Sequence, residues 1–158
     1  WNDQTDLGKP IKECIFELKQ AYPKYAPYIV AYWYCYKDMD AGEIPGIYDV
    51  MKDLKDRGYQ LYCLTNWSHE TFPIVKKVHA RLFELFDGIV VSGEEKMVKP
   101  NPEIYNLLLG RYNLNASESV FIDDRQRNVD GANQVGIQGI LFTGSNNLKE
   151  QLFQLSIL

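Results

Sequence analysis

Cysteine is scarce in this chain, and its pattern excludes two kinds of stabilised fold. The three cysteines, Cys14, Cys35 and Cys63, are odd in number, lie far apart and have no CxxC spacing. Such a set indicates neither a disulfide framework nor a zinc site. We therefore expect a reducing compartment, and because no secretory signal is visible we expect a cytoplasmic protein.

Basic runs and long apolar runs are also missing. The 158 residues include 17 basic and 21 acidic side chains, for a net charge of -4, whereas proteins that bind nucleic acids or acidic membranes usually carry a basic patch. The densest apolar stretch, residues 28–36, has nine residues, and a membrane-spanning helix needs roughly 20. We expect no nucleic-acid and no membrane partner. The sequence leaves the oligomeric state open.

Residues 10–40 have a helical pattern. Apolar residues recur there at every third or fourth position, and Pro23 and Pro27 interrupt the pattern, which predicts two helices. We interpret the aromatic residues at helical spacing as a packed face between these helices rather than a ligand-stacking surface; they are Tyr28, Tyr32, Trp33 and Tyr36.

After residue 42, helices alternate with short apolar strands. The pattern predicts a helix from Ile47 that ends at Gly58, and further helices near residues 70–78, 102–110 and 126–135. It predicts strands at residues 59–64, 88–91, 119–122 and 137–142. Alternation of this kind implies an α/β fold, a Rossmann-like parallel sheet with helices on both faces.

Ligands of open parallel sheets bind at the carboxyl ends of the strands, so the polar residues found there are candidates for a site. The first cluster is Thr65, Asn66 and Ser68, just past a strand and before a helix. Hydroxyl, amide and backbone N–H groups at a helix N-terminus favour an anion. The alternative is a turn with Ser68 as an ordinary helix cap.

The second cluster centres on Lys99, which lies just before a predicted helix. A cation is unfavourable at that end of a helix dipole, so an anionic group should compensate it; the alternative is a solvated surface lysine. The third cluster is Asp123 and Asp124 at the end of an apolar strand, with Asn128 one turn into the next helix. Buried carboxylates cost several kcal/mol each unless they are paired, which favours Mg²⁺ as a partner, although helix capping would explain one of them.

Together these clusters resemble a known family. Residues 61–66, 99–105 and 120–124, with Asn128 and Ala132, are similar to motifs two, three and four of the haloacid dehalogenase superfamily in its helical-cap form. The resemblance implies a partial helical cap at residues 1–42 and a Rossmann-like core at residues 43–158. It also implies Mg²⁺-dependent chemistry through an aspartyl-phosphate intermediate.

The resemblance also implies a role for each site residue. Thr65 would hydrogen-bond the transferring phosphoryl group, with Asn66 beside it, and Lys99 would bridge that group and the nucleophile. Asp124 would ligate Mg²⁺ directly, Asp123 would be a second ligand or an outer partner that orients water, and Asn128 would support this loop. Phosphoryl transfer needs such positioning and charge neutralisation more than acid–base groups.

The family's first motif, which carries the nucleophilic Asp, has no match before residue 42. The segment Asp38-Met39-Asp40 has the right letters, but it lies just before the chain returns from the cap, and a solvated helix end explains it better. We therefore expect this chain to be the C-terminal portion of a longer protein. The missing strand would lie upstream and would pair between the strands that carry Thr65 and Asp123.

The leading functional hypothesis is a phosphatase of a small phosphorylated metabolite. The first alternative is a 2-haloacid dehalogenase, which shares the fold and needs no metal. The second is a catalytically inactive binding module that keeps the anion site. The identity of the substrate is not readable, because the cap supplies specificity in this arrangement and its residues carry no recognisable code.

Overall fold

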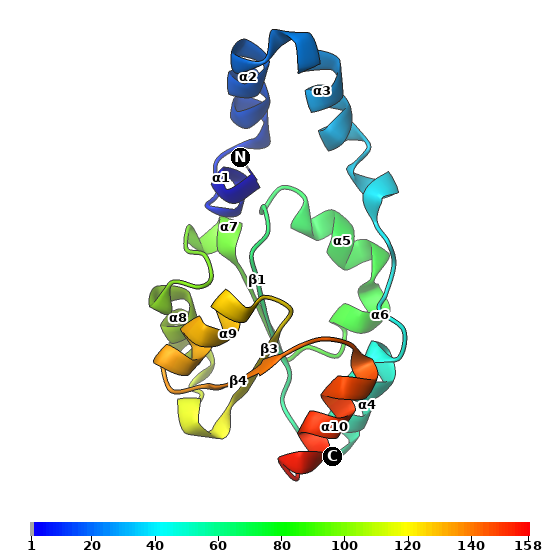
Figure 1. Cartoon of the computed structure of the whole chain (residues 1–158), viewed down its shortest axis with the longest axis vertical. Coiled ribbons are helices and arrows are strands. Elements are labelled where there is room, and N and C mark those ends of the chain that lie inside the picture. The colour runs from blue at the N-terminus through cyan, green and yellow to red at the C-terminus, as the bar shows by residue number, and fades with distance from the viewer. Residues whose placement is uncertain (1) are drawn as a thin grey trace.

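Four short parallel strands form the centre of the computed structural model, which describes residues 2–158 (Figure 1). They are β1 (Tyr62–Thr65), β2 (Gly88–Val91), β3 (Val120–Asp123) and β4 (Gln138–Leu141). β1 pairs with β2, and β3 pairs with β4, both in parallel. Among the described residues the two pairs form separate two-stranded sheets, so β1 and β3 do not pair with each other.

Helices follow the strands as the alternation predicts. The helices of this part are α4 (Ile47–Asp56), α5 (Phe72–Val78), α6 (Ala80–Phe83), α7 (Ser92–Glu95), α8 (Pro102–Tyr112), α9 (Gln126–Gln134) and α10 (Ser145–Gln154), with a 3-10 turn η3 (Ala116–Glu118). The parallel α/β class is confirmed. The sequence patterns did not predict α6 and α7, which have four residues each and are too short to show a period, or α10.

The N-terminal helices lie away from the strands, at the upper end of Figure 1. They are α1 (Asn2–Asp6), α2 (Ile11–Ala21) and α3 (Ala26–Tyr34), with the 3-10 turns η1 (Pro23–Tyr25) and η2 (Tyr36–Met39). The two predicted helices are confirmed. The packed aromatic face is only partly correct, because Trp33 stacks on Tyr36 at 6.3 Å between ring centroids whereas Tyr28 is 73% exposed.

Two hydrophobic clusters cover the strands. One joins residues of β1, β2 and α8 to Phe121 of β3, Ala132 of α9 and Ile137, which precedes β4. The other lies between α4, α10 and β4 and is built on Val50, Leu54, Ile140, Leu148 and Leu152. Val120 packs against the second cluster, while its neighbour Phe121 belongs to the first. This alternation follows from the opposite directions of successive side chains in a strand.

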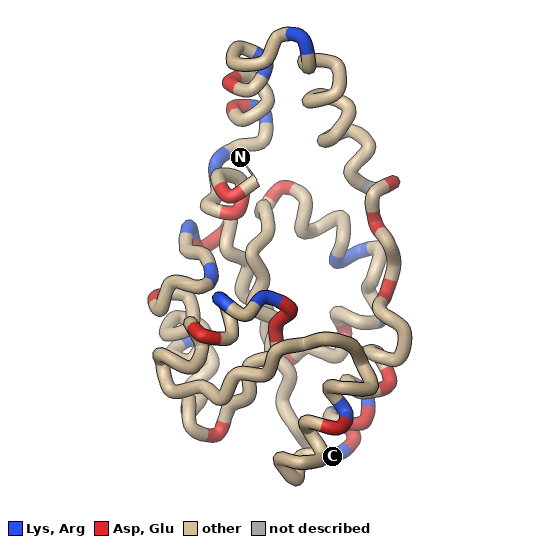
Figure 2. Tube along the Cα trace, in the orientation of Figure 1, with Lys and Arg blue, Asp and Glu red and all other residues tan. Residues whose placement is uncertain are grey.

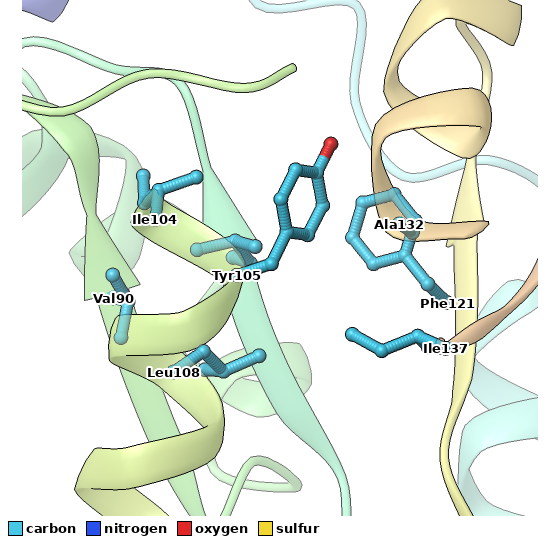
Figure 3. Packing of buried hydrophobic residues seen from close by; sticks show 8 residues of the cluster. Val90, Ile104, Tyr105, Leu108, Phe121, Ala132 and Ile137 are labelled. Carbon is cyan, nitrogen blue, oxygen red and sulfur yellow. The ribbon is translucent and has the colours of Figure 1, made fainter. Parts of the chain in front are cut away.

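Tyr105 connects the two strand pairs. It is fully buried on α8, and its ring meets that of Phe121 on β3 at 5.3 Å between centroids and 83° between planes. Figure 3 shows the ring directed from α8 toward Phe121 and Ala132. Since β1 and β3 share no backbone hydrogen bonds, side chains such as this one hold the two halves together.

Asp87 fixes the start of β1. Its carboxylate accepts hydrogen bonds from Lys55 Nζ on α4 at 2.7 Å and from Leu61 N at 2.8 Å. The backbone N–H of Leu61 is thereby taken by a side chain, and β1 begins at Tyr62 rather than at the predicted residue 59. The Lys55 hydrogen bond outweighs partial burial and lowers the pKa of Asp87, with the Leu61 N–H contributing further.

The substitution Asp87→Asn should lower the free energy of unfolding by about 1 kcal/mol at pH 7, because it removes a half-exposed ion pair and weakens one hydrogen bond. A depressed pKa adds stability above the unfolded value of about 3.9, and this stability is lost as pH falls through the folded value. Urea unfolding of both proteins should therefore show a constant difference from pH 7 to about 5 that disappears below pH 4. A difference independent of pH would contradict the assigned role.

None of the helices within residues 2–158 is long and apolar enough to cross a bilayer. Cys14, Cys35 and Cys63 are all free thiols, as their spacing predicted.

Candidate functional site

Lys99 lies where the ends of β1 and β3 meet. Its Nζ donates to the backbone oxygen of Leu64 at 2.7 Å and to Asp123 Oδ2 at 2.7 Å. Only 8% of Lys99 is exposed, so the surface-lysine alternative is wrong. The anion that the sequence required near this cation is, among the described residues, Asp123. Two of the three predicted clusters therefore meet in one buried ion pair.

Asn66 joins the first cluster to the second. Its Nδ2 donates to Lys99 O at 3.0 Å, and its Oδ1 accepts from Lys99 N at 2.9 Å. Both ends of the amide thus hold the backbone of Lys99, which fixes the lysine side chain relative to β1. In this structure Asn66 positions Lys99.

Asp123 is held by three donors. Besides Lys99, its Oδ1 accepts from Arg125 N and from Asn128 Nδ2, each at 2.9 Å. Burial on its own would raise the pKa of Asp123, but the hydrogen bond and charge of Lys99, together with these two donors, outweigh it and lower the pKa. The capping alternative does not hold for α9, whose N-cap is Arg125 without a side-chain cap bond.

Asp124 and Thr65 lie at the open end of the same arrangement. Asp124 is exposed directly after β3, and no salt bridge within residues 2–158 involves it. Thr65 is the half-buried last residue of β1, opposite Val91 of β2. Figure 2 shows acidic positions followed by basic ones where β3 leads into α9. Among the described residues no three acidic, His or Cys side chains form a ready metal cluster.

Asn128 carries an unsatisfied buried atom. The residue is buried, and its Oδ1 has no hydrogen-bond partner among the described atoms. Unpaired buried acceptors are costly, so an unmet polar atom beside a carboxylate needs an explanation, of which a bound water or ion is one. The backbone oxygen of Asn128 accepts a hydrogen bond from Tyr105 Oη at 2.7 Å, which ties α9 to α8.

The sequence patterns did not predict three residues that hold the site in place: Ser92, Tyr105 and Gly131. Ser92, fully buried after β2, accepts a hydrogen bond at Oγ from Trp67 N at 2.9 Å. Tyr105 supports α9, and Gly131 comes so close to the Lys99-Pro100 turn that a Cβ there would lie 2.6 Å from Pro100 O. The position of Ser92 at the carboxyl end of a strand was a usable signal. The other two depend on packing between helices, which periodicity does not show.

Neither Cys63 nor the Asp38-Met39-Asp40 segment is suited to be the nucleophile. Burial raises the pKa of Cys63 to about 11, although the charge of Lys99 opposes this, so the thiol stays protonated at neutral pH and is a poor nucleophile. The Asp38-Met39-Asp40 segment lies at η2 rather than on a strand. Asp40 is bonded to His79 Nε2 at 2.6 Å and to Gly42 N at 2.8 Å, whereas the Lys99 ammonium group is bonded to Leu64 O and Asp123.

Comparison with known proteins gives a family match and several relatives. A family model described as haloacid dehalogenase-like hydrolase matches residues 8–136. A sesquiterpene phosphatase of Aspergillus oryzae is 35% identical over 67% of this chain and 54% of its own length. An (S)-2-haloacid dehalogenase of Burkholderia cepacia is 25% identical over 75% of this chain and 50% of its own.

Solved structures agree with this match. A HAD family enzyme of Bacteroides thetaiotaomicron, crystallised with magnesium and inorganic phosphate, is 27% identical, with a TM-score of 0.55 over 61% of this chain and 50% of that one. The chain thus spans about half the length of the relatives that it matches.

Proposed function

Because this chain belongs to the haloacid dehalogenase-like hydrolases, we propose that it is the C-terminal part of a Mg²⁺-dependent phosphatase that acts on a small phosphorylated metabolite. The observation that carries the proposal is the buried Lys99, whose Nζ lies between Leu64 O at the end of β1 and Asp123 at the end of β3. A fixed cation at the meeting point of two strand ends is suited to stabilise an anionic group.

Each residue around Lys99 has a different role in binding a phosphoryl group. Thr65 presents a hydroxyl at the end of β1, and Asn66 holds the Lys99 backbone at 2.9 and 3.0 Å, so the cation cannot swing away. Asp123, in turn, accepts a hydrogen bond from the ammonium group at 2.7 Å and so fixes its direction. Such preorganisation costs no rearrangement during the reaction, which is the main source of electrostatic catalysis.

The carboxylates of Asp123 and Asp124 would supply part of a magnesium site. Asp124 is exposed and suits a direct ligand, whereas both oxygens of Asp123 already accept hydrogen bonds, which favours an outer role that orients water. The unpaired Oδ1 of Asn128 is a further acceptor beside them. Mg²⁺ is commonly held by one or two carboxylates, waters and substrate phosphate, where it neutralises phosphoryl oxygens. The remaining protein ligand and the nucleophile would come from outside these residues.

The nucleophilic Asp, in this proposal, belongs to a strand that precedes residue 1 and pairs between β1 and β3. Two observations support it: these strands do not pair with each other, and Ile122, an apolar residue inside β3, is 36% exposed. Parallel strands are normally buried on both faces. Residues 1–42 would then be part of a helical cap, and residues 43–158 the core without that strand. The nucleophile would form the aspartyl-phosphate intermediate.

The dehalogenase remains the alternative that a named relative favours. The test is to purify the protein as it occurs in its source and to measure phosphate release from phosphate monoesters and chloride release from 2-chloropropionate. We expect phosphate release that stops when EDTA removes Mg²⁺. Chloride release unaffected by EDTA would establish the dehalogenase, and binding of phosphate without any turnover would establish the inactive module.

The metal assignment can be tested on this chain alone. Asp124→Asn should weaken Mg²⁺ binding by at least about tenfold, measured by calorimetry in the presence of phosphate. Even the loss of a group that only supports a metal ligand typically costs about 10–100-fold in metal affinity. Folding should be unchanged, because Asp124 is exposed. Asp130→Asn, an exposed change on α9, is the matched control and should leave Mg²⁺ affinity as it was. If the Asp124 variant bound Mg²⁺ as tightly as the native protein, Asp124 would not be a metal ligand.

A further inference from the structure

A cavity of about 280 Å³ lies between the segment that follows α3 and the helix α5. Its wall includes Tyr36 and Met39 on one side, Ile74 and Val78 on the other, and Trp67 between them. This volume is close to the lower end of ligand pockets, roughly 300–1,000 Å³, which are mostly apolar with a few polar groups. The cavity is therefore large enough for one organic group of a ligand.

Trp67 connects the cavity wall to the candidate phosphate site. Trp67 follows Thr65 by two residues, a reach of at most about 7 Å. The indole is fixed, because Trp67 N donates to Ser92 Oγ at 2.9 Å and Nε1 donates to Thr71 Oγ1 at 3.1 Å. A phosphoryl group held by Thr65 and Lys99 would thus place the group esterified to it within reach of the cavity wall.

Most polar side-chain atoms of the wall are already engaged. Tyr32 Oη accepts a hydrogen bond from Asn2 at 3.1 Å, and Trp67 Nε1 donates to Thr71 Oγ1 at 3.1 Å. Asp40, the charged residue of the wall, is paired with His79 at 2.6 Å. What the wall offers to a ligand is ring faces and aliphatic carbon. A sugar placed there would lose hydrogen bonds to water without replacing them.

The rim of the cavity also exposes apolar surface. Val78 is 59% exposed and Met39 is 48% exposed, and both line the cavity. Contiguous exposed apolar residues at a hollow mark binding sites. A ligand that covers them would gain roughly 25 cal/mol for each Å² removed from water.

We propose that this cavity binds the apolar ester group of the substrate, so that the preferred substrates are phosphate monoesters of apolar alcohols, alkyl or isoprenyl, rather than of sugars. The proposal rests on the proposed function, since it assumes a phosphoryl group at Thr65 and Lys99. It adds a substrate class, and it assigns recognition of that class to residues of η2, the loop after β1, and α5.

The test separates the two halves of such a substrate. Calorimetry with the complete protein purified from its source, kept in EDTA so that geranyl phosphate is not turned over, measures binding of three probes below their aggregation concentrations: inorganic phosphate, geraniol and geranyl phosphate. We expect geraniol to bind, and geranyl phosphate to bind at least about tenfold more tightly than inorganic phosphate. The double substitution Met39→Gln with Val78→Gln should weaken geraniol and geranyl phosphate at least about fivefold and leave inorganic phosphate unchanged. Both positions are half-exposed, and glutamine adds no charge, so folding and anion attraction are kept.

The control is Leu7→Gln with Ile44→Gln, at positions that are 44% and 51% exposed and outside the cavity wall. It should leave all three affinities unchanged. If geraniol does not bind and geranyl phosphate binds no more tightly than inorganic phosphate, the cavity proposal is overturned while the anion site stands. If geraniol binds and inorganic phosphate does not, the cavity stands and the phosphate site of the proposed function fails.

Discussion

Replacing Lys99 by methionine should lower the free energy of unfolding by about 3–5 kcal/mol, because it leaves Asp123 as an unpaired buried carboxylate. The two side chains form an ion pair at 2.7 Å with side-chain exposures of 9% and 6%, well below those of a surface pair. Urea unfolding at pH 7 measures this loss. In the complete enzyme the same change should also reduce the rate at least about 10²-fold, since it removes a charge beside the developing anion.

Two further proteins make this prediction specific. The double variant Lys99→Met with Asp123→Asn should recover much of the lost stability, because no buried charge remains and the amide oxygen can still accept from Arg125 N. In the native protein the lowered pKa of Asp123 supplies stability above about pH 4 that is lost as pH falls through its folded value. The difference between native and Lys99→Met proteins should therefore shrink in acid. A loss below about 1 kcal/mol at pH 7 would show that the pair behaves as a solvated one.

Truncation of Tyr105 to alanine should cost about 3–5 kcal/mol, as is typical when a buried aromatic side chain is removed. The expected cost is high because Tyr105 has no exposed surface and packs against Phe121 across the boundary between the two strand pairs. The measurement is the midpoint and slope of the urea unfolding transition, with far-ultraviolet circular dichroism as the signal.

Tyr105→Phe is the matched control. It keeps the ring contact with Phe121 and removes only the hydrogen bond to Asn128 O at 2.7 Å, so a loss of about 1 kcal/mol is expected. A cost of less than about 1.5 kcal/mol for the alanine variant would mean that the halves do not depend on this contact. A fall in the slope of the transition, without a change in midpoint, would instead show that the halves unfold separately.

The order and type of the main elements followed from the sequence alone. The strand predicted at residues 88–91 has the same limits as β2. The helix from Ile47 is predicted to end at Gly58 because glycine is a favoured C-cap residue; in the structure α4 ends at Asp56, and Gly58 adopts the positive φ of 90° that favours glycine. The clusters at Thr65, Lys99 and Asp123 follow from the same patterns, since Thr65 and Asp123 lie at the ends of apolar runs and Lys99 lies just before a predicted helix. Local patterns determine these features because periodicity and turn chemistry act over a few residues.

The contacts that make a site of these clusters were decided by the tertiary structure. Lys99 is bonded to Asp123, which is 24 residues away in the sequence, and to Leu64, which is 35 residues away. No local pattern predicts which strand ends will lie together. The same holds for the amide of Asn66, for the placement of Tyr105 between the strand pairs, and for the cavity beside Trp67. Sequence by itself determined which residues are chemically capable of binding a phosphoryl group and that strands and helices alternate. Only the folded chain decided that Lys99 is buried and paired, because burial and strand neighbours depend on packing between segments far apart in the chain.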